Sequence, residues 1–191
     1  MTRILGAHAA RQLQERARGL DDRPVQRTGL VRTASISYRF DRDELTPATH
    51  LAVLTGLADQ LGARLRTAGE ACRSLTLTIR LADGSTLTRS RALPEPTSHS
   101  PVLRQAAHDL YRRLRLERAR VRELALRAEG LVDAGDSYHQ LQLDPVDDKQ
   151  RRLERAADAV RARFGSHVIT TAAGHAHAGC QDRSGFGLRA P

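Results

Sequence analysis

Aromatic residues are scarce in this sequence: among 191 residues there are three Tyr, three Phe and no Trp. A core built from it must therefore be filled by aliphatic side chains. Long apolar runs are missing as well, and the first twenty residues carry charges throughout, so we expect neither a transmembrane helix nor a secretory signal. Cys72 and Cys180 are the only cysteines and lie far apart, so we expect reduced thiols in a cytoplasmic protein.

Acidic residues are outnumbered, 22 against 31 basic ones, which gives a net charge of +9. The excess lies in residues 1–33 and 71–133, and concentrated positive charge favours a polyanionic partner such as nucleic acid. Lys149 is the only lysine, and an arginine bias of this kind also arises from a GC-rich genome at any solvated position. A solvated surface that binds no ligand therefore remains an alternative.

Motifs for catalysis are missing too. The sequence has no Walker loop, no nucleophile elbow and no dinucleotide-binding glycine pattern. The acidic pairs Asp21-Asp22 and Asp147-Asp148 flank predicted helix ends, where a capping role accounts for them. His175, His177 and Cys180 lack a fourth ligand, so we expect no metal site, no cofactor and no catalytic residue. The residues alone indicate a binding module.

The spacing of apolar residues predicts the order of the elements. A four-residue spacing over 5–17 indicates a short helix, and spacings of three and four indicate helices over 47–69 and 101–114. Alternation predicts strands over 33–40, 74–81 and 85–93, with Asp83-Gly84 as the hairpin turn between the last two. The segment PEPTSHS should interrupt the structure, and a further strand should end near Val132.

The order β-α-β-β-α-β across residues 33–133 is typical of a split β-α-β, or ferredoxin-like, arrangement. This is an α+β fold, a four-stranded antiparallel sheet with two helices on one face. The other face is free to bind a ligand. Around this domain, residues 25–32 and 134–146 are expected to be linkers, 147–165 a C-terminal helix and 166–191 a disordered tail.

Groups that bind phosphate oxygens are frequent on the predicted strands. The candidate nucleic-acid-binding residues are Thr33, Ser35, Ser37, Arg39, Arg80, Thr88, Arg89, Ser90 and Arg91, with the hydroxyls of Thr76 and Thr78 beside them. Base stacking is not expected, because Tyr38 and Phe40 fall on the apolar side of their strand. Arg89 and Arg91 share a side of their strand, but one sequence does not reveal whether Arg80 lies on that side.

A set of segments resembles a known family. These are Gly19–Val25 (GLDDRPV), Ser35–Leu45, Leu75–Arg80 and Thr88–Pro94. Together they resemble the C-terminal part of Y-family translesion DNA polymerases of the bacterial DNA polymerase IV type, over about residues 3–165. The resemblance implies that residues 1–24 are the end of the thumb and 33–133 the little-finger domain. It implies binding of primer-template or damaged DNA without sequence preference, in DNA repair by translesion synthesis near the nucleoid.

In that family the carboxylates that hold two magnesium ions lie before the thumb, and this sequence begins within the thumb. We therefore expect no nucleotidyl transfer from this chain alone, with magnesium needed only if a separate palm domain is supplied. A separate chain carrying palm and fingers, which would complete a split polymerase, is the alternative.

A second resemblance concerns the QLQLD segment. Gln140, Leu141 and Leu143 are similar to the sliding-clamp-binding peptide of these polymerases, whereas Asp144 stands where that peptide usually ends in Phe. Loss of a buried aromatic anchor can cost roughly a hundredfold in affinity. The resemblance implies the clamp as a partner, with a vestigial linker, or a clamp-interaction module without DNA binding, as alternatives.

Overall fold

The computed structural model describes residues 17–18, 32–116, 118–136, 145–165 and 168–169. The chain divides into two units, Met1–Leu30 and Val31–Pro191, and the elements below belong to the second. The expected N-terminal helix, the linker after it, the QLQLD segment and the C-terminal tail fall almost wholly outside the described residues.

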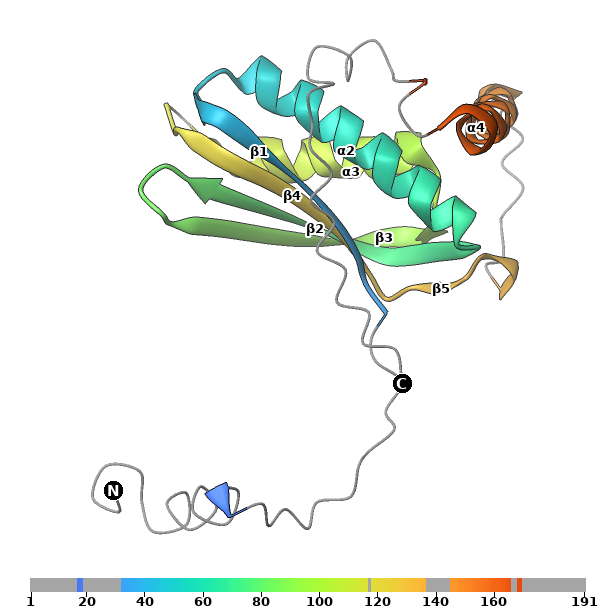
Figure 1. Cartoon of the computed structure of the whole chain (residues 1–191), viewed down its shortest axis with the longest axis horizontal. Coiled ribbons are helices and arrows are strands. Elements are labelled where there is room, and N and C mark those ends of the chain that lie inside the picture. The colour runs from blue at the N-terminus through green and yellow to red at the C-terminus, as the bar shows by residue number, and fades with distance from the viewer. Residues whose placement is uncertain (1–16, 19–31, 117, 137–144, 166–167, 170–191) are drawn as a thin grey trace. The chain divides into compact units, whose positions relative to one another are not determined.

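The second unit alternates strands and helices in the predicted order (Figure 1). Its elements are β1 (Ala34–Glu44), α2 (Pro47–Thr67), β2 (Glu70–Leu81), β3 (Thr86–Thr97), α3 (Ser100–Arg113), β4 (Val121–Glu129), β5 (Val132–Asp133), a short 3-10 turn (Ala134–Asp136) and α4 (Pro145–Phe164). No helix in the described part of the chain is long and apolar enough to cross a membrane.

The sheet has the strand order β1-β4-β2-β3, and each neighbouring pair is antiparallel. Both β-α-β units are therefore split, since β4 lies between β1 and β2, and β2 lies between β3 and β4. Two residues of β5 pair with the start of β2. Helices α2 and α3 lie together on one face of the sheet (Figure 1), which confirms the predicted α+β arrangement.

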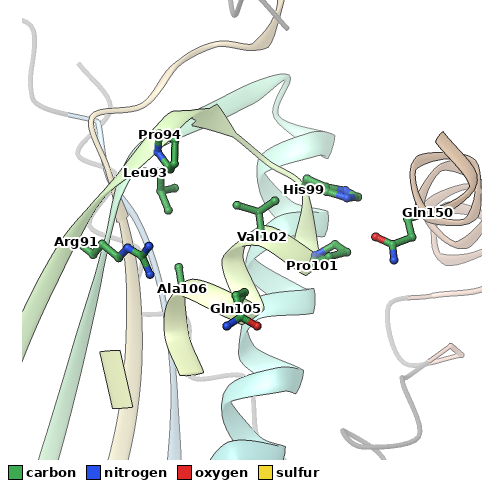
Figure 2. Close-up of a pocket in the computed structure, with 9 residues that line it drawn as sticks. All are labelled: Arg91, Leu93, Pro94, His99, Pro101, Val102, Gln105, Ala106 and Gln150. Carbon is green, nitrogen blue, oxygen red and sulfur yellow. The ribbon is translucent and has the colours of Figure 1, made fainter. Parts of the chain in front are cut away.

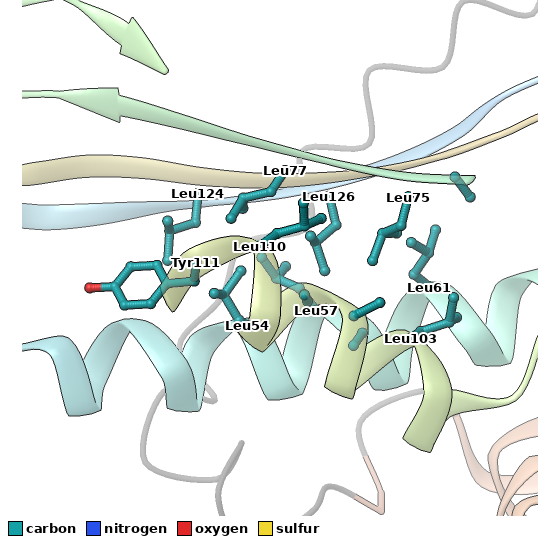
Figure 3. Close-up of a cluster of buried hydrophobic side chains, with 14 of the residues drawn as sticks. Leu54, Leu57, Leu61, Leu75, Leu77, Leu103, Leu110, Tyr111, Leu124 and Leu126 are labelled. Carbon is teal, nitrogen blue, oxygen red and sulfur yellow. The ribbon is translucent and has the colours of Figure 1, made fainter. Parts of the chain in front are cut away.

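The core between sheet and helices is aliphatic (Figure 3). Leu54, Leu61 and Leu65 of α2 recur along one side of the helix and are fully buried. They pack with fully buried leucines of β2 and β4, including Leu77 and Leu126. Burying such a side chain stabilises the fold by about 1.5–3 kcal/mol, so one apolar stripe per helix is enough to hold it on the sheet.

Strand β3 runs further than the sequence predicts, through Pro94 and Pro96 to Thr97. The interruption expected across PEPTSHS is therefore shorter than predicted and is limited to residues 98–99. β3 is an edge strand, where a proline removes no ladder hydrogen bond that a neighbour needs. A register shift between Cys72 and Ser74 of β2 accommodates this part of the strand.

Helix α4 is attached by charges. The guanidinium of Arg66 on α2 donates two hydrogen bonds to Asp158, of 2.6 and 3.1 Å, and one of 3.1 Å to Glu154. Glu154 also accepts a 2.8 Å bond from the backbone N–H of Ser100 and lies 2.6 Å from Nδ1 of His99. The N-cap residue of α3, His99, makes no side-chain hydrogen bond that caps its own helix. Glu154 of α4 caps the N-terminus of α3 instead.

Gly62 of α2 makes room for this junction. A Cβ at Gly62 would lie 2.5 Å from Oγ of Ser100 and 3.1 Å from the carbonyl oxygen of Ser98. A side chain there would push α2 away from the segment that joins β3 to α3. The close approach brings Arg66 within hydrogen-bond distance of the same Ser98 carbonyl, at 2.8 Å.

Candidate nucleic-acid interface

The face of the sheet opposite the helices, here called the open face, includes three cross-strand rows that run across all four long strands. Residues paired directly across antiparallel strands point to the same side of the sheet. Reading from β1 through β4 and β2 to β3, the rows are Ser35-Arg127-Thr76-Ser90, Ser37-Ala125-Thr78-Thr88 and Arg39-Glu123-Arg80-Thr86. The structure therefore brings together most of the predicted hydroxyl and arginine residues on this face.

The middle of the open face is formed by small side chains. Thr76 and Ser90 share a hydrogen bond of 2.8 Å between their hydroxyl oxygens, and the row beside it contains only Ser, Ala and Thr. Guanidinium groups lie on either side of this row, Arg127 in the first row and Arg39 and Arg80 in the third. Such a surface lets a sugar-phosphate backbone approach closely and offers no aromatic ring for base stacking.

Two of the predicted residues, Arg89 and Arg91, are not on the open face. Arg89 pairs with Leu77 and Arg91 with Leu75, and both leucines point into the core under the helices. Arg91 donates a 2.8 Å hydrogen bond to Asp109 of α3, which confirms that it lies on the helix side. The expectation that these arginines accompany the strand hydroxyls is therefore wrong. Thr33 precedes β1 and is exposed.

At one end of the sheet, Arg39 and Arg80 lie among further exposed arginines that sequence reasoning did not single out. We define the basic end as the exposed residues Arg39, Arg42, Arg80, Arg112, Arg113, Arg115, Arg118 and Arg120. The segment between α3 and β4 supplies Arg115, Arg118 and Arg120 and adjoins the sheet, because the carbonyl of Arg120 accepts a 2.9 Å bond from the N–H of Ala82. The sequence carries the signal as the run RRLRLERARVR, most of which lies outside the predicted strands.

The backbone at the basic end is held in an unusual conformation. Arg115 and Arg118 have φ angles of 46° and 53°, in the left-handed region that non-glycine residues rarely adopt. The carboxylate of Asp43, which lies near the basic end, is paired with Arg122. The guanidinium of Arg122 donates hydrogen bonds to both carboxylate oxygens, at 3.0 and 3.3 Å. The hydrogen bond from Arg122 holds the pKa of Asp43 below its ordinary value, with Arg120 and Arg39 adding to the effect.

The helix side carries a pocket of about 310 Å³ between β3, α3 and α4. Figure 2 shows its apolar lining, formed by Leu93 and Pro94 of β3 and Val102 of α3 among others. Arg91 at its edge is held by Asp109. The pocket therefore offers little to an anion. Among the residues described, no three His, Cys, Asp or Glu side chains come together as a metal-binding group.

Fold and surface together define the class of domain. A chimeric Y-family DNA polymerase of known structure superposes with a TM-score of 0.53, covers 69% of this chain and 37% of its own, and is 16% identical in sequence. At that identity the likeness shows a shared fold. The α+β unit thus shares its fold with part of a Y-family DNA polymerase.

Sequence comparison then gives the family. Residues 31–144 match the impB/mucB/samB family C-terminal domain, and the chain belongs to this family. The DNA polymerase IV of Dehalococcoides mccartyi is 31% identical over 168 residues, which cover 87% of this chain and 42% of that protein. That of Moorella thermoacetica is 32% identical over 161 residues, covering 83% and 40%. The chain spans about two fifths of the length of the curated relatives it matches.

Proposed function

We propose that the little-finger-like domain binds duplex or primer-template DNA through its open face and basic end, without sequence preference and without catalysis of its own. The observation that carries this proposal is the placement of Arg39 and Arg80. Both are exposed, lie in one row of the open face, and adjoin the arginine-rich segment between α3 and β4. One continuous surface then combines small hydroxyl side chains with guanidinium groups.

The chemistry of this surface favours contact with phosphates over contact with bases. Hydroxyl and guanidinium groups bind phosphate oxygens, which fix the position of a duplex but carry no sequence information. If four to six phosphates are neutralised, the logarithm of the association constant should fall against the logarithm of salt concentration with a slope of roughly −4 to −5.

The names of the relatives, both DNA polymerases IV, support a role in DNA synthesis, and the resemblance of the sequence implies that this is translesion synthesis. In this role the chain acts on the bacterial chromosome in the cytoplasm as the DNA-gripping part of a polymerase, with palm and fingers supplied by another polypeptide segment. The sliding clamp is the second proposed partner, bound through Gln140, Leu141 and Leu143, which lie outside the described residues.

Two double variants test the DNA-binding surface. Arg39→Ala with Arg80→Ala removes two guanidinium groups from the open face, and Arg89→Ala with Arg91→Ala removes two from the helix side of the same sheet. The first pair should weaken DNA binding by about 1–3 kcal/mol and lower the salt slope by nearly two units, as two lost phosphate contacts would. Fluorescence anisotropy with a labelled primer-template at several salt concentrations measures both quantities.

The second pair is the matched control, because it changes the net charge equally and each pair breaks one ion pair, Arg80 with Glu123 or Arg91 with Asp109. It should change the affinity only slightly. If both double variants fold and lose the same amount of DNA affinity, binding depends only on the net charge of the chain. The open face is then not the binding surface.

A further inference from the structure

Helix α4 turns Glu154 and Asp158 toward the domain. Glu154 and Asp158 are bound by Arg66, as described above, and Arg161 donates a 3.0 Å bond to Asp158 from within α4. Of the described side chains of α4, these are the acidic ones. Docking of the helix therefore leaves cationic and apolar groups on its other side.

We call that other side the outward face of α4. It consists of the exposed residues Lys149, Arg152, Leu153, Arg155, Ala156, Ala159, Arg163 and Phe164. With 100° of rotation per residue, all of them fall within one half of the helix surface, on the side away from Asp158. Among the side chains that the structure describes, this face has basic and apolar residues and no acid. Such a face suits a partner surface that is acidic around an apolar depression.

The apolar groups of the outward face are unusually open to water. Leu153 is 71% exposed and Phe164 is 61% exposed, the two highest values among the large apolar side chains of the described residues. Arg163 lies 5.2 Å from the centre of the Phe164 ring and covers it only partly. The two side chains lie about 16 Å apart along the helix, so they are separate apolar points, and Leu153 is the one near the start of α4.

The position of α4 in the chain indicates which molecule this is. The helix begins at Pro145, directly after the QLQLD segment at 140–144. We propose that the first half of the outward face, around Arg152 and Leu153, is a second contact surface for the sliding clamp. This inference rests on the proposed clamp binding through Gln140, Leu141 and Leu143. With a rise of 1.5 Å per residue, Leu153 lies about 12 Å along the helix from Pro145, and Phe164 about 28 Å.

A second contact would compensate for the low clamp affinity expected of the QLQLD segment, in which Asp144 replaces the usual aromatic anchor. Once the segment is bound, contacts from the adjoining helix form within the same complex, at an effective concentration in the millimolar range. A contact too weak to be seen alone then adds to the overall affinity. Because α4 is fixed to the domain by Arg66, the same contact would also orient the DNA-binding domain on the clamp.

Two pairs of variants of the full chain test this inference against the purified sliding clamp from the same genome. Leu153→Ser is compared with Phe164→Ser, and Arg152→Ala with Arg163→Ala. All four side chains are exposed, so the variants should fold normally. Members of each pair have the same chemistry but lie at different distances from the QLQLD segment. Surface plasmon resonance with immobilised clamp measures the affinity.

We expect Leu153→Ser to weaken clamp binding about tenfold and Arg152→Ala about threefold, with less than a twofold change from Phe164→Ser and Arg163→Ala. If the two members of each pair lose the same clamp affinity, the helix binds the clamp nonspecifically along its whole length, and the inference is overturned. The same follows if Arg152→Ala weakens DNA binding as much as clamp binding, since the partner of the face would then be nucleic acid.

The double variant Gln140→Ala with Leu141→Ala separates this inference from the function on which it rests. If it abolishes clamp binding while Leu153→Ser has no effect, the proposed clamp binding is supported and the proposed contact by α4 is contradicted. If the unaltered chain does not bind the clamp, both proposals are contradicted. Loss of affinity in both the double variant and Leu153→Ser, with Phe164→Ser unchanged, is the expected result.

Discussion

Helices α2 and α4 are attached to the same domain by different forces. α2 lies on the sheet through fully buried leucines such as Leu54 and Leu61, whereas α4 is joined to α2 through the carboxylates of Glu154 and Asp158. Apolar attachment grows with buried area and needs no particular alignment of atoms. Attachment by charges depends on a few hydrogen bonds of correct geometry. The two attachments should therefore fail under different conditions.

This difference suits the two roles proposed for the molecule. The sheet and α2 must hold the rows of the open face in fixed register whatever the salt concentration, since DNA binding itself depends on salt. The contacts of α4 decide only how the outward face is oriented. Three experiments separate the two attachments, beginning with the largest expected effect.

Leu126→Ala should destabilise the sheet and α2 together. Leu126 is fully buried in the central strand β4, between Ile36 of β1 and Leu77 of β2. Removing its methyl groups leaves a cavity and should lower the free energy of unfolding by about 2–5 kcal/mol. Urea denaturation followed by circular dichroism measures the loss. Leu153→Ala on α4 is the control and should stay within about 0.5 kcal/mol of the unaltered chain.

Arg66→Ala should release α4 and leave the sheet in place. The Arg66 side chain is 17% exposed and binds Glu154 and Asp158 of α4, so its removal leaves these two carboxylates without their main cation. The helix can then separate and hydrate these groups, which limits the cost to roughly 1–3 kcal/mol. Hydrogen exchange should show loss of protection in α4 and unchanged protection in β2 and β4.

Arg155→Ala is the matched control for the release of α4, because it removes an exposed arginine from the outward face of the same helix. It should leave protection in α4 unchanged. Simultaneous loss of protection in α4, β2 and β4 after Arg66→Ala would contradict the separation of the two attachments, because the helix would then be part of one cooperative unit.

The contrast between these attachments also explains which features the sequence predicts. The leucine stripe of α2 and the alternation in β1 and β2 are local patterns, and they predict the α+β order correctly. The face on which Arg89 and Arg91 lie depends on the register between β2 and β3, which a single sequence does not contain. The helix side then follows only from the pairing with Leu77 and Leu75.

Arg66 shows the same limit more strongly. In the sequence it is one arginine near a predicted helix end, with nothing to distinguish it from its neighbours. Its partners Glu154 and Asp158 lie 88 and 92 residues further along the chain. Only the folded structure brings such groups together. The arginines of the basic end, in contrast, are close in sequence, and a search for charge runs outside the strands would have found them.

Acid should weaken the attachment of α4 before it unfolds the sheet, and this is the smallest of the three effects. Burial raises the pKa of Glu154, but hydrogen bonds from His99 and Ser100 and the charge of Arg66 outweigh it and lower the pKa from 4.5 to about 2. A carboxyl group whose pKa is lower in the folded state stabilises that state above its unfolded pKa. The contribution of Glu154 should therefore be complete above pH 4.5 and decline as the pH falls toward 2.

NMR signals from α4 amides and from the Leu126 methyl groups follow the two attachments separately during an acid titration. The α4 signals should change at a higher pH than those of Leu126, because Leu126 and the leucines packed with it carry no ionisable group. Glu154→Gln keeps the size of the side chain but removes the titrating group, so the α4 signals of this variant should lose most of their pH dependence. If α4 and Leu126 signals change together at one pH in the unaltered chain, the charges do not hold the helix separately, and docking of α4 is then as much a part of the aliphatic fold as α2.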